Sequence, residues 1–432
     1  MSQAFELSPK SENLDCIHCG MCLSSCPTYT KVWSEADSPR GRIHLITAAG
    51  QGKIPMDETF RRHIDLCLGC RACESACPSG VQFEHLLTAA RSEMEKLLPR
   101  GRLQTVLRDL GFRHLLPHPK RLHAFFRLIR WMQKLPAGWI KELLPQGSAA
   151  RRALEQLESL PPIDPGVRIL SRPQPAGGTA TNRAAFFRGC VMNEIYFPAQ
   201  VATLRVLEAA ACAVEIPEGQ TCCGALHEHN GEREQARELA WRNIQAFASS
   251  SPLPVITNSA GCGALLKRYD RLFDSADGRR AAAGLFSTRV RDFSEFLAGR
   301  APDLPLGPVR ARVTYDDPCH LIHGQKISQP PRVLLQRIPG VQYVELNHAS
   351  WCCGSAGTYS LTQPEMAALI QRDKTENILA AGVEAVVTAN PGCMLQIKSG
   401  LRKAGSKIEV LHLAEILDRS IRSVPVHNPG DI

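Results

Sequence analysis

The chain has 432 residues and 17 cysteines, and its 51 Lys and Arg against 42 Asp and Glu give a formal net charge of +9. Hydrophobic residues at 44% and charged residues at 22% are ordinary for globular proteins and exclude a disordered or fibrous chain. No apolar run approaches the roughly 18 residues that a membrane-spanning helix needs, and the N-terminus lacks a signal-peptide pattern, so we expect a cytoplasmic protein. Because cytoplasmic thiols stay reduced, the cysteines are expected to bind metal rather than form disulfides.

The cysteines and the basic residues are unevenly distributed. Eight cysteines come before residue 78, none falls between Cys77 and Cys190, and eight more follow Cys190. The gap holds the basic excess, since Lys96 to Arg152 contains 13 Lys and Arg against two acidic residues, a net charge of +11 (13 − 2). A Pro/Gly-rich stretch follows, as is typical of a linker. We expect a head (1–98), a basic helical connector (99–160), a linker (161–182), a first cysteine-rich repeat (183–305) and a second one (306–432).

The head contains one cysteine spacing twice. Residues 16–27 and 67–78 each read C-x₂-C-x₂-C-x₃-C-P, a run of bacterial two-cluster ferredoxins in which the fourth cysteine binds the other cluster. Helical spacing at 41–49 and 57–66 leaves room for the two runs to face each other. We predict two [4Fe–4S] clusters, one held by Cys16, Cys19, Cys22 and Cys77 and the other by Cys67, Cys70, Cys73 and Cys26.

A pair of zinc sites is the alternative interpretation of the eight head cysteines. Zinc ribbons use two C-x₂-C pairs that are set well apart in the sequence. Four thiols within 11 residues, followed by Pro and present twice, favour iron–sulfur clusters instead.

The connector mixes basic and large apolar residues. Phe125, Ile129 and Met132 are spaced to share one helical face, and arginines flank it. Such a helix suits an anionic membrane surface or an acidic partner. The alternative is a connector that packs its apolar side on its own domains and leaves a solvated basic face. We expect no nucleic-acid binding, because no recognition motif is present.

The later cysteines form a repeat. Each copy has a lone cysteine, then Cys-Cys-Gly, then Gly-Cys, and the copies are offset by 129, 130 and 131 residues at these points. An offset of this length indicates a duplicated domain rather than a solenoid. The repeated cysteines are Cys190, Cys222, Cys223 and Cys262 in the first copy and Cys319, Cys352, Cys353 and Cys393 in the second. Cys212 has no counterpart, and we expect it to fill the core from an alanine-rich helix at 207–214.

Short apolar runs alternate with helical stretches in each copy. In the second copy we expect strands at 313–315, 341–346 and 385–388 and helices at 331–338 and 364–381. The alternation predicts a parallel sheet whose loops gather at the carboxyl ends of the strands. Since each repeated cysteine falls on such a loop, four thiols should converge in each copy as ligands of a further cluster or metal. The alternative is that these cysteines are buried and redox-inert.

The predicted fold class is therefore α+β overall: an α-helical, ferredoxin-like head with two [4Fe–4S] motifs, then a duplicated α/β cysteine-rich domain with parallel strands. There is no G-x-G-x-x-G after a strand, no P-loop and no nucleophile elbow, so we expect no flavin or nicotinamide on this chain and assign no catalytic residue. Four histidines, His18, His227, His320 and His323, lie near cysteines, and we assign none of them to a metal.

The expected role is electron transfer between other redox centres. Oxidation of an organic substrate usually removes a hydride, which iron–sulfur clusters cannot accept directly. We therefore infer that the chain takes single electrons from a flavin on another subunit and passes them on.

Several motifs resemble the iron–sulfur subunit of bacterial glycolate oxidase. They are residues 39–42 (Pro-Arg-Gly-Arg), 317–319 (Asp-Pro-Cys), 323–326 (His-Gly-Gln-Lys) and 351–362, which include Gly-Ser-Ala-Gly-Thr-Tyr-Ser, and the resemblance spans about 14–420. It implies a complex with FAD-binding subunits that oxidise glycolate to glyoxylate. It also implies electron delivery to a respiratory quinone or another membrane acceptor, with peripheral contact at the cytoplasmic face of the inner membrane.

The duplicated domain is also similar to the cysteine-rich domains of heterodisulfide reductases, which end in C-x-x-C. Ser259 and Asn390 replace the first of these cysteines, so a conventional cluster, another metal or free thiols all stay open in the repeats. The alternative functions are an iron–sulfur subunit for lactate or anaerobic glycerol-3-phosphate oxidation, or a thiol–disulfide reductase that uses Cys353. A scaffolding role for the repeats is a further alternative.

Overall fold

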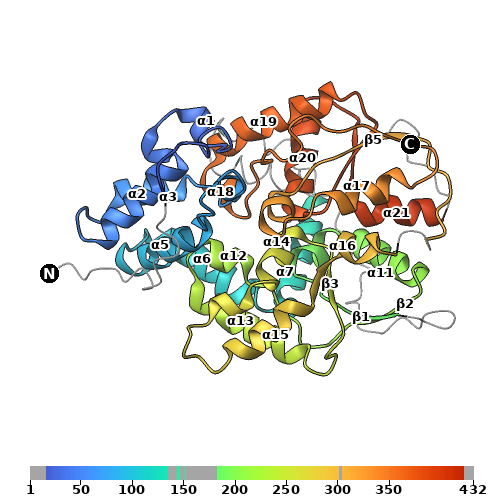
Figure 1. Ribbon diagram of the computed structural model, residues 1–432, viewed down its shortest axis with the longest axis horizontal. Coiled ribbons are helices and arrows are strands. Elements are labelled where there is room, and N and C mark those ends of the chain that lie inside the picture. Colours follow the sequence, from blue (N-terminus) through green and yellow to red (C-terminus); the bar gives the residue numbers. More distant parts are fainter. Residues whose placement is uncertain are drawn as a thin grey trace.

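The computed structural model describes residues 16–134, 182–300 and 304–422, together with Leu143, Pro145 and Arg151. Figure 1 shows the helical head on the left and the two repeats stacked beside it. Most of the predicted linker at 161–182 lies outside the described residues, as do Trp139 and Ile140 of the connector. In the parts of the chain described here, no helix combines the length and the apolar character needed to cross a membrane.

The head is built from short helices. They are α1 (Tyr29–Val32), η2 (Glu35–Asp37), α2 (Pro39–Gly50), α3 (Glu58–Asp65), α4 (Ala72–Ser75) and α5 (Phe83–Leu97). The helix α2 begins where the Ser38 hydroxyl accepts the Gly41 N–H at 2.9 Å, and Asp57 caps α3 by accepting from the Phe60 N–H at 2.9 Å. Both helices predicted between the cysteine runs are thus confirmed. Ile46, Ile64 and Leu87 are fully buried where α2, α3 and α5 meet.

The connector begins with α6 (Arg102–Arg108), η3 (Asp109–Leu115, a π-helix) and α7 (Pro119–Gln133). On the apolar face expected for α7, Phe125 and Met132 are exposed, which agrees with a contact surface and not with packing of that face on the chain's own domains. Instead Leu122 and Phe126 are buried, with Ile129 half-buried beside them. The helix α7 therefore has two apolar faces. The face with Leu122 and Phe126 is the one that packs, because it lies against α10 and α20 of the repeats.

The first repeat has a four-stranded parallel sheet in the order β2-β1-β3-β4. Its strands are β1 (Asn182–Phe186), β2 (Cys212–Glu215), β3 (Val255–Thr257) and β4 (Val290–Asp292). Its helices are α10 (Val191–Ile195), α11 (Phe197–Ala209), α12 (Ala225–His229), α13 (Arg233–Ala246), α14 (Ala260–Leu266), η4 (Tyr269–Leu272), α15 (Arg280–Arg289) and α16 (Phe293–Ala298).

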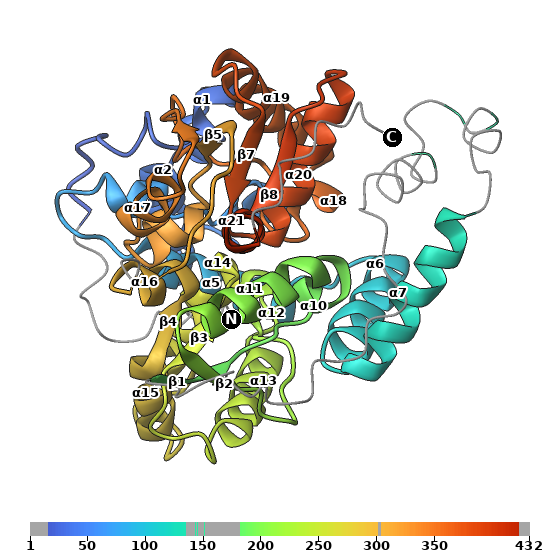
Figure 2. The same ribbon diagram turned by 90° about the vertical axis from the view of Figure 1, so that its right-hand side faces the viewer.

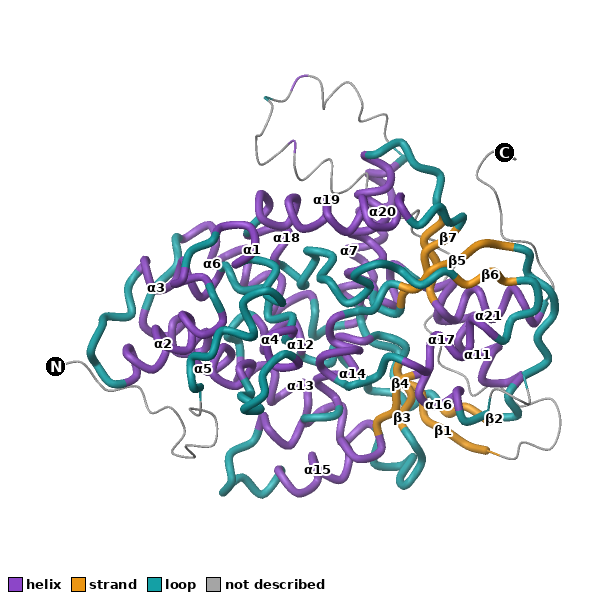
Figure 3. Tube along the Cα trace, turned by 45° about the horizontal axis from the view of Figure 1, so that its top comes forward, coloured by secondary structure: helices purple, strands orange, loops and turns teal. Residues whose placement is uncertain are grey.

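The second repeat has the same topology, with a parallel sheet in the order β6-β5-β7-β8. Its strands are β5 (Ala311–Tyr315), β6 (Val341–Tyr343), β7 (Ala385–Thr388) and β8 (Glu409–His412). Its helices are η6 (His320–Gly324), α17 (Gln329–Gln336), α18 (Tyr359–Thr362), α19 (Pro364–Ala380), α20 (Pro391–Lys403) and α21 (Leu413–Ile421). The identical strand order agrees with the predicted duplication, and Figure 3 shows both sheets on the side of the molecule away from the head.

The two repeats share one hydrophobic core. Its members include Phe186 and Ile256 of the first repeat and Val313 and Leu417 of the second, all fully buried. The helices α11 and α21 lie side by side across the boundary (Figure 2). Because neither repeat closes its core alone, the pair forms a single structural unit.

Two predictions about individual cysteines are wrong. Cys212 is the first residue of strand β2, not part of a helix, because α11 already ends at Ala209. It is nevertheless buried in the core, as expected of a filler. Cys262 and Cys393 lie in the first turns of α14 and α20 rather than in loops.

Candidate metal centres

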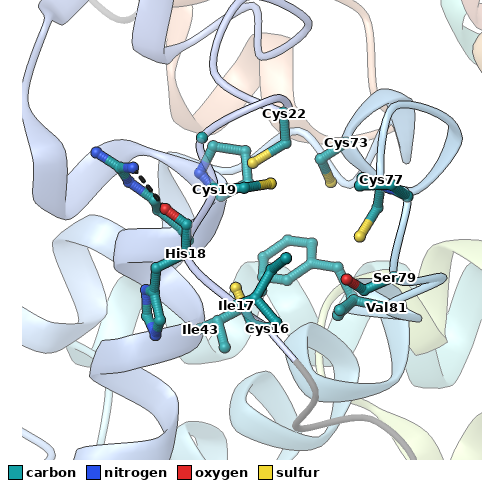
Figure 4. A pocket seen from close by; sticks show the side chains of 15 residues that line it. Cys16, Ile17, His18, Cys19, Cys22, Ile43, Cys73, Cys77, Ser79 and Val81 are labelled. Carbon is teal, nitrogen blue, oxygen red and sulfur yellow. Dashed lines mark hydrogen bonds between the residues drawn. The ribbon is translucent and has the colours of Figure 1, made fainter.

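The first cysteine site is a cavity in the head. Four of its cysteines, Cys19, Cys22, Cys73 and Cys77, point their sulfurs into a common space, and Cys16 lies at its lower side (Figure 4). Between the thiols the wall is apolar, with Ile43, Val81 and Phe83. The cavity contains all four cysteines predicted for the first cluster, including Cys77 from the second run.

The second cysteine site lies next to the first. Its cavity is lined by Cys67, Cys70 and Cys73 of the second run and by Cys26 of the first. Cys73 borders both cavities. The helices α2 and α3 thus fold the two runs face to face, so that the last cysteine of each run reaches the site of the other.

The thiols of the head surround open space. Among the described residues, no group of three or more His, Cys, Asp or Glu side chains is arranged to hold a single metal ion. A cluster of several irons differs from a single ion because its four cysteine ligands surround a bulky core. The head thiols surround cavities and do not converge on one point, so they fit [4Fe–4S] clusters better than single zinc ions.

Arg42 is a buried cation beside the second site. Its guanidinium Nη1 lies 3.9 Å from the sulfur of Cys26, and only 1% of the residue is exposed. The guanidinium is held by Asp37 at 3.5 Å and by the carbonyl oxygen of His63 at 2.8 Å. Sequence analysis singles out Arg42 only as part of the Pro-Arg-Gly-Arg motif at 39–42. An arginine on the apolar side of a predicted helix would also have indicated a buried charge. The positive charge of Arg42 offsets the negative charge of thiolates in an apolar setting.

Burial raises the pKa of the Cys70 and Cys73 thiols well above the ordinary value. Buried thiols of this kind stay protonated and unreactive unless a positive charge replaces the proton. A metal ion supplies such a charge, because its binding expels the proton from the thiol. Cys70 and Cys73 are therefore suited to metal ligation rather than to thiol chemistry.

The eight repeated cysteines all line one cavity of about 610 Å³ between the two repeats. In the first repeat the sulfurs of Cys190 and Cys222 are 3.5 Å apart and those of Cys223 and Cys262 are 3.2 Å apart. The sequence predicts four converging thiols in each copy. It does not predict that both sets face the same space, which follows from the packing of one repeat on the other.

The glycine of each Cys-Cys-Gly tripeptide holds a conformation that other residues rarely adopt. The φ angles are +88° at Gly224 and +86° at Gly354. A Cβ atom on Gly354 would also lie 2.7 Å from the carbonyl oxygen of Ala367. These turns let backbone N–H groups donate to sulfur, from Gly224 to Cys222 at 3.5 Å and from Gly354 to Cys352 at 3.4 Å.

The two cysteine sets have different surroundings. In the first repeat, hydrogen bonds from Cys190, Cys223 and then His227 hold the pKa of Cys222 well below its usual range. In the second repeat a buried pair, Lys374 Nζ and Asp316 Oδ1 at 2.8 Å, lies near Cys353 and Cys393. The pair could have been predicted in part from the sequence, because Lys374 falls among apolar residues on one face of a long helix, α19.

Of the two positions that lack a thiol, Asn390 bonds across the boundary between the repeats. Asn390 accepts the Gly261 N–H of the first repeat at 3.1 Å, and its amide nitrogen lies 3.6 Å from the sulfur of Cys393. Ser259 is buried at the start of α14. Each repeat therefore offers four thiols to the cavity.

The second head site lies against the second repeat. Cys70 and Cys352 belong to one hydrophobic cluster, and Cys319 packs against it. His320 Nε2 is 3.1 Å from the carbonyl oxygen of Gly69, and the Tyr359 hydroxyl donates to Leu66 at 2.9 Å. The second head site is thus the link between the head and the repeat cysteines.

The fold and these sites define an iron–sulfur electron-transfer protein, with a helical head that carries two thiol-lined cavities, followed by paired cysteine-rich domains. Three family descriptions match the chain: "4Fe-4S dicluster domain" at 12–81, "Glycolate oxidase iron-sulfur subunit, linker region" at 103–160 and "Cysteine-rich domain" at 184–267 and 313–398. A "Probable glycolate oxidase iron-sulfur subunit" of Bacillus subtilis is 39% identical over 95% of both chains. The chain belongs to the family of glycolate oxidase iron–sulfur subunits.

Other relatives carry related names. The "Glycolate oxidase iron-sulfur subunit" of Escherichia coli is 29% identical and covers 94% of this chain and 93% of its own length. One of the subunits of the "Fumarate reductase (CoM/CoB)" of Methanothermobacter marburgensis is 37% identical over 93% of this chain and 71% of its own. A "Lactate utilization protein A" of Oceanobacillus iheyensis is 28% identical over 55% of this chain and 96% of its own.

Proposed function

We propose that this chain is the electron-transfer subunit of a complex in which FAD-binding subunits oxidise glycolate to glyoxylate. The observation that carries the proposal is a continuous series of thiol-lined sites, with two in the head and the second of them packed against the repeat cysteines. The relatives named for glycolate oxidase match this chain over nearly its whole length and support the choice of substrate.

In the head, Cys16, Cys19, Cys22 and Cys77 would hold one [4Fe–4S] cluster, and Cys67, Cys70, Cys73 and Cys26 the other. When bound, the clusters supply one-electron transfer, which splits the two electrons of a reduced flavin. The chain's residues place the two sites side by side, with Cys73 bordering both cavities. Arg42 provides positive charge at the second site. No residue of this chain acts on glycolate itself, because substrate oxidation belongs to the flavin subunits.

Downstream of the head, the proposed route runs through the repeats to a respiratory quinone at the cytoplasmic face of the inner membrane. The repeat cysteines would hold a further cluster or metal. The α7 surface supports peripheral membrane contact, because Leu128 and Trp131 are exposed among basic residues. A lactate-oxidising complex is the second candidate, favoured by the relatives named for lactate utilization.

A reconstitution test separates these candidates. The purified chain is combined with its FAD-binding partner subunits, and reduction of an artificial acceptor is measured with glycolate, lactate or glycerol-3-phosphate. The proposal expects turnover with glycolate that requires both this chain and a flavin subunit. Glycolate oxidation by this chain alone, or turnover with lactate only, would contradict it.

A further inference from the structure

The cavity between the repeats extends well beyond its cysteines. On α20, Leu395, Gln396, Ser399 and Lys403 form one lining face at helical spacing. Ten residues separate Cys393 from Lys403, which is about 15 Å along a helix. A space of this length has room beside the thiols for something other than their metal.

A second helix forms the facing wall of this outer part. Pro364, Ala367, Ala368 and Gln371 of α19 line it at i, i+3, i+4 and i+7, and Leu361 of α18 adds another apolar side chain. Among the described residues that line the cavity there is no carboxylate, and Lys403 is the one lysine or arginine. Lys403 already donates to Gln371 Oε1 at 3.2 Å. The outer part therefore suits a neutral, mainly apolar molecule.

The inner end of the cavity lies next to the cysteine sites through which electrons are proposed to pass. Leu68, in the second cysteine run of the head, lines the cavity together with the eight repeat thiols. His229 of the first repeat and His320 of the second also line it, with ring centroids 5.0 Å apart. A molecule bound here would have redox sites at one end, so the ligand is expected to be an electron acceptor.

The connector forms part of the cavity's surroundings. Met192, Ile195 and Leu395 line the cavity and also pack in the cluster that contains Leu122 and Phe126 of α7. The opposite side of α7 exposes Leu128, at 54%, and Trp131, at 61%. A basic helix with exposed apolar residues suits an anionic membrane surface, from which a lipid-soluble ligand could enter.

We propose that this cavity binds a quinone, the acceptor to which the chain delivers its electrons. The cavity of about 610 Å³ includes the space around the eight thiols, where their metal would sit, and the quinone would take the outer part between α19 and α20, whose apolar walls with a few polar groups are typical of small-molecule sites. The quinone takes up two electrons, supplied one at a time through the head, and two protons from solvent, and it leaves as the hydroquinone. The inference rests on the proposed function for the source of the electrons, but not for the binding itself.

Binding is tested by calorimetry on the full chain with its clusters in place. The probe is decyl-ubiquinone, whose fully substituted ring resists addition of thiols. Ala368→Trp places a bulky ring in the cavity from an exposed position, and Leu369→Trp places the same ring on the next residue of α19, which does not line the cavity. We expect saturable binding that Ala368→Trp weakens by about tenfold or more and that Leu369→Trp leaves unchanged. No saturable binding, or equal binding by both variants, would overturn the inference.

Two further arms separate this inference from the proposed function. If oxidised glutathione competes with decyl-ubiquinone and is itself reduced, the site is a disulfide site and the quinone proposal fails. If the flavin subunits do not reduce the head clusters, the proposed function fails, whereas the calorimetric result still decides whether the cavity binds a quinone.

Discussion

The guanidinium of Arg42 lies 3.9 Å from the sulfur of Cys26, the cysteine that the first run contributes to the second site. A fixed positive charge stabilises the reduced, more negative form of a nearby cluster. The first site has no equivalent buried arginine at its thiols among the described residues, since Arg40 there is partly exposed and bonds the carbonyl oxygen of His18. If both sites hold clusters, we expect this asymmetry to give the second cluster the higher reduction potential, which would favour electron flow toward the repeats.

Replacing Arg42 should therefore lower one reduction potential. Arg42→Gln is expected to lower the potential of the second cluster by roughly 50–150 mV, given the energy of a unit charge about 4 Å away and about 59 mV per tenfold change. A redox titration followed by electron paramagnetic resonance measures it. Arg42→Lys, which keeps the charge, should restore most of the shift, and Arg62→Gln on the exposed side of α3 should cause none. Equal potentials in all variants would contradict the assigned role.

The crossed arrangement of the head cysteines predicts which cluster each substitution damages. Cys77→Ser should damage the same cluster as Cys16→Ser, although Cys77 belongs to the second run. Cys26→Ser should damage the other cluster, together with Cys67→Ser. Resonance spectra of the reduced variants distinguish the two clusters. Pairing of Cys77→Ser with Cys67→Ser would instead mean that each run binds its own cluster.

Glu84 of the head forms an ion pair with Arg268 of the first repeat. Its carboxylate contacts Arg268 Nη2 at 2.8 Å and Arg71 Nη1 at 3.1 Å. Burial opposes the charge, but Arg268 and then Arg71 hold the pKa of this carboxyl well below its ordinary value. Its contribution to stability is therefore complete above about pH 4.5 and is lost as the pH falls below that value.

Glu84→Gln should lower the free energy of unfolding by about 3 kcal/mol, since it removes the carboxylate that pairs with buried Arg268 and one of the two that pair with Arg71. Thermal unfolding at pH 7 measures the loss. Glu93→Gln, which removes a more exposed pair with Lys96, should cost less than about 1 kcal/mol. Equal melting temperatures for the two variants would show that Glu84 does not stabilise this boundary.

His412 makes the junction of the repeats sensitive to pH. Its Nε2 lies 2.8 Å from the carbonyl oxygen of Asn258, and its Nδ1 accepts the Ala414 N–H at 3.1 Å, so the ring is neutral. Burial lowers its pKa to about 4. The unfolded chain binds a proton near pH 6.5 and the folded chain does not, so stability falls as the pH drops from about 6.5 to 4.

The wild type should therefore lose about 1.4 kcal/mol per pH unit in this range through His412. His412→Asn can still cap α21 but cannot titrate, so it should lack this part of the loss. Denaturant unfolding at pH 6.5 and pH 5 measures the difference. His114→Asn, at an exposed position of the connector, should keep the wild-type dependence. An unchanged dependence in His412→Asn would contradict the assignment.

The connector should bind anionic membranes through α7. Replacing Leu128 and Trp131 together by Glu is expected to reduce cosedimentation with phosphatidylglycerol vesicles by about fivefold or more. Leu285→Glu changes a similarly exposed leucine, on α15 of the first repeat, and should have no effect. Equal sedimentation of both proteins would leave α7 without a membrane role.

Sequence spacing is enough to predict which head cysteines lie around each of the two cavities. The two runs and the helices between them require only local spacing, and the parallel sheets follow from alternating apolar and helical segments. The remaining features depend on how the elements pack against one another, which sequence spacing does not reveal. Leu122 rather than Phe125 is buried because of what lies opposite α7, and Cys212 begins a strand because α11 ends early. The common cavity depends on how the repeats share a core, and the contacts of Arg42 with His63 and of Glu84 with Arg268 join residues that are far apart in the sequence.

Freeze-quench electron paramagnetic resonance shows whether glycolate reduces the clusters of this chain. The chain is assembled with its FAD-binding subunits and mixed with glycolate, and samples are frozen before any acceptor is added. We expect two interacting [4Fe–4S] clusters to become reduced, and we expect Arg42→Gln to shift electrons from the second cluster to the first. A reduced flavin that passes electrons to an added acceptor while the clusters of this chain stay oxidised would contradict this expectation.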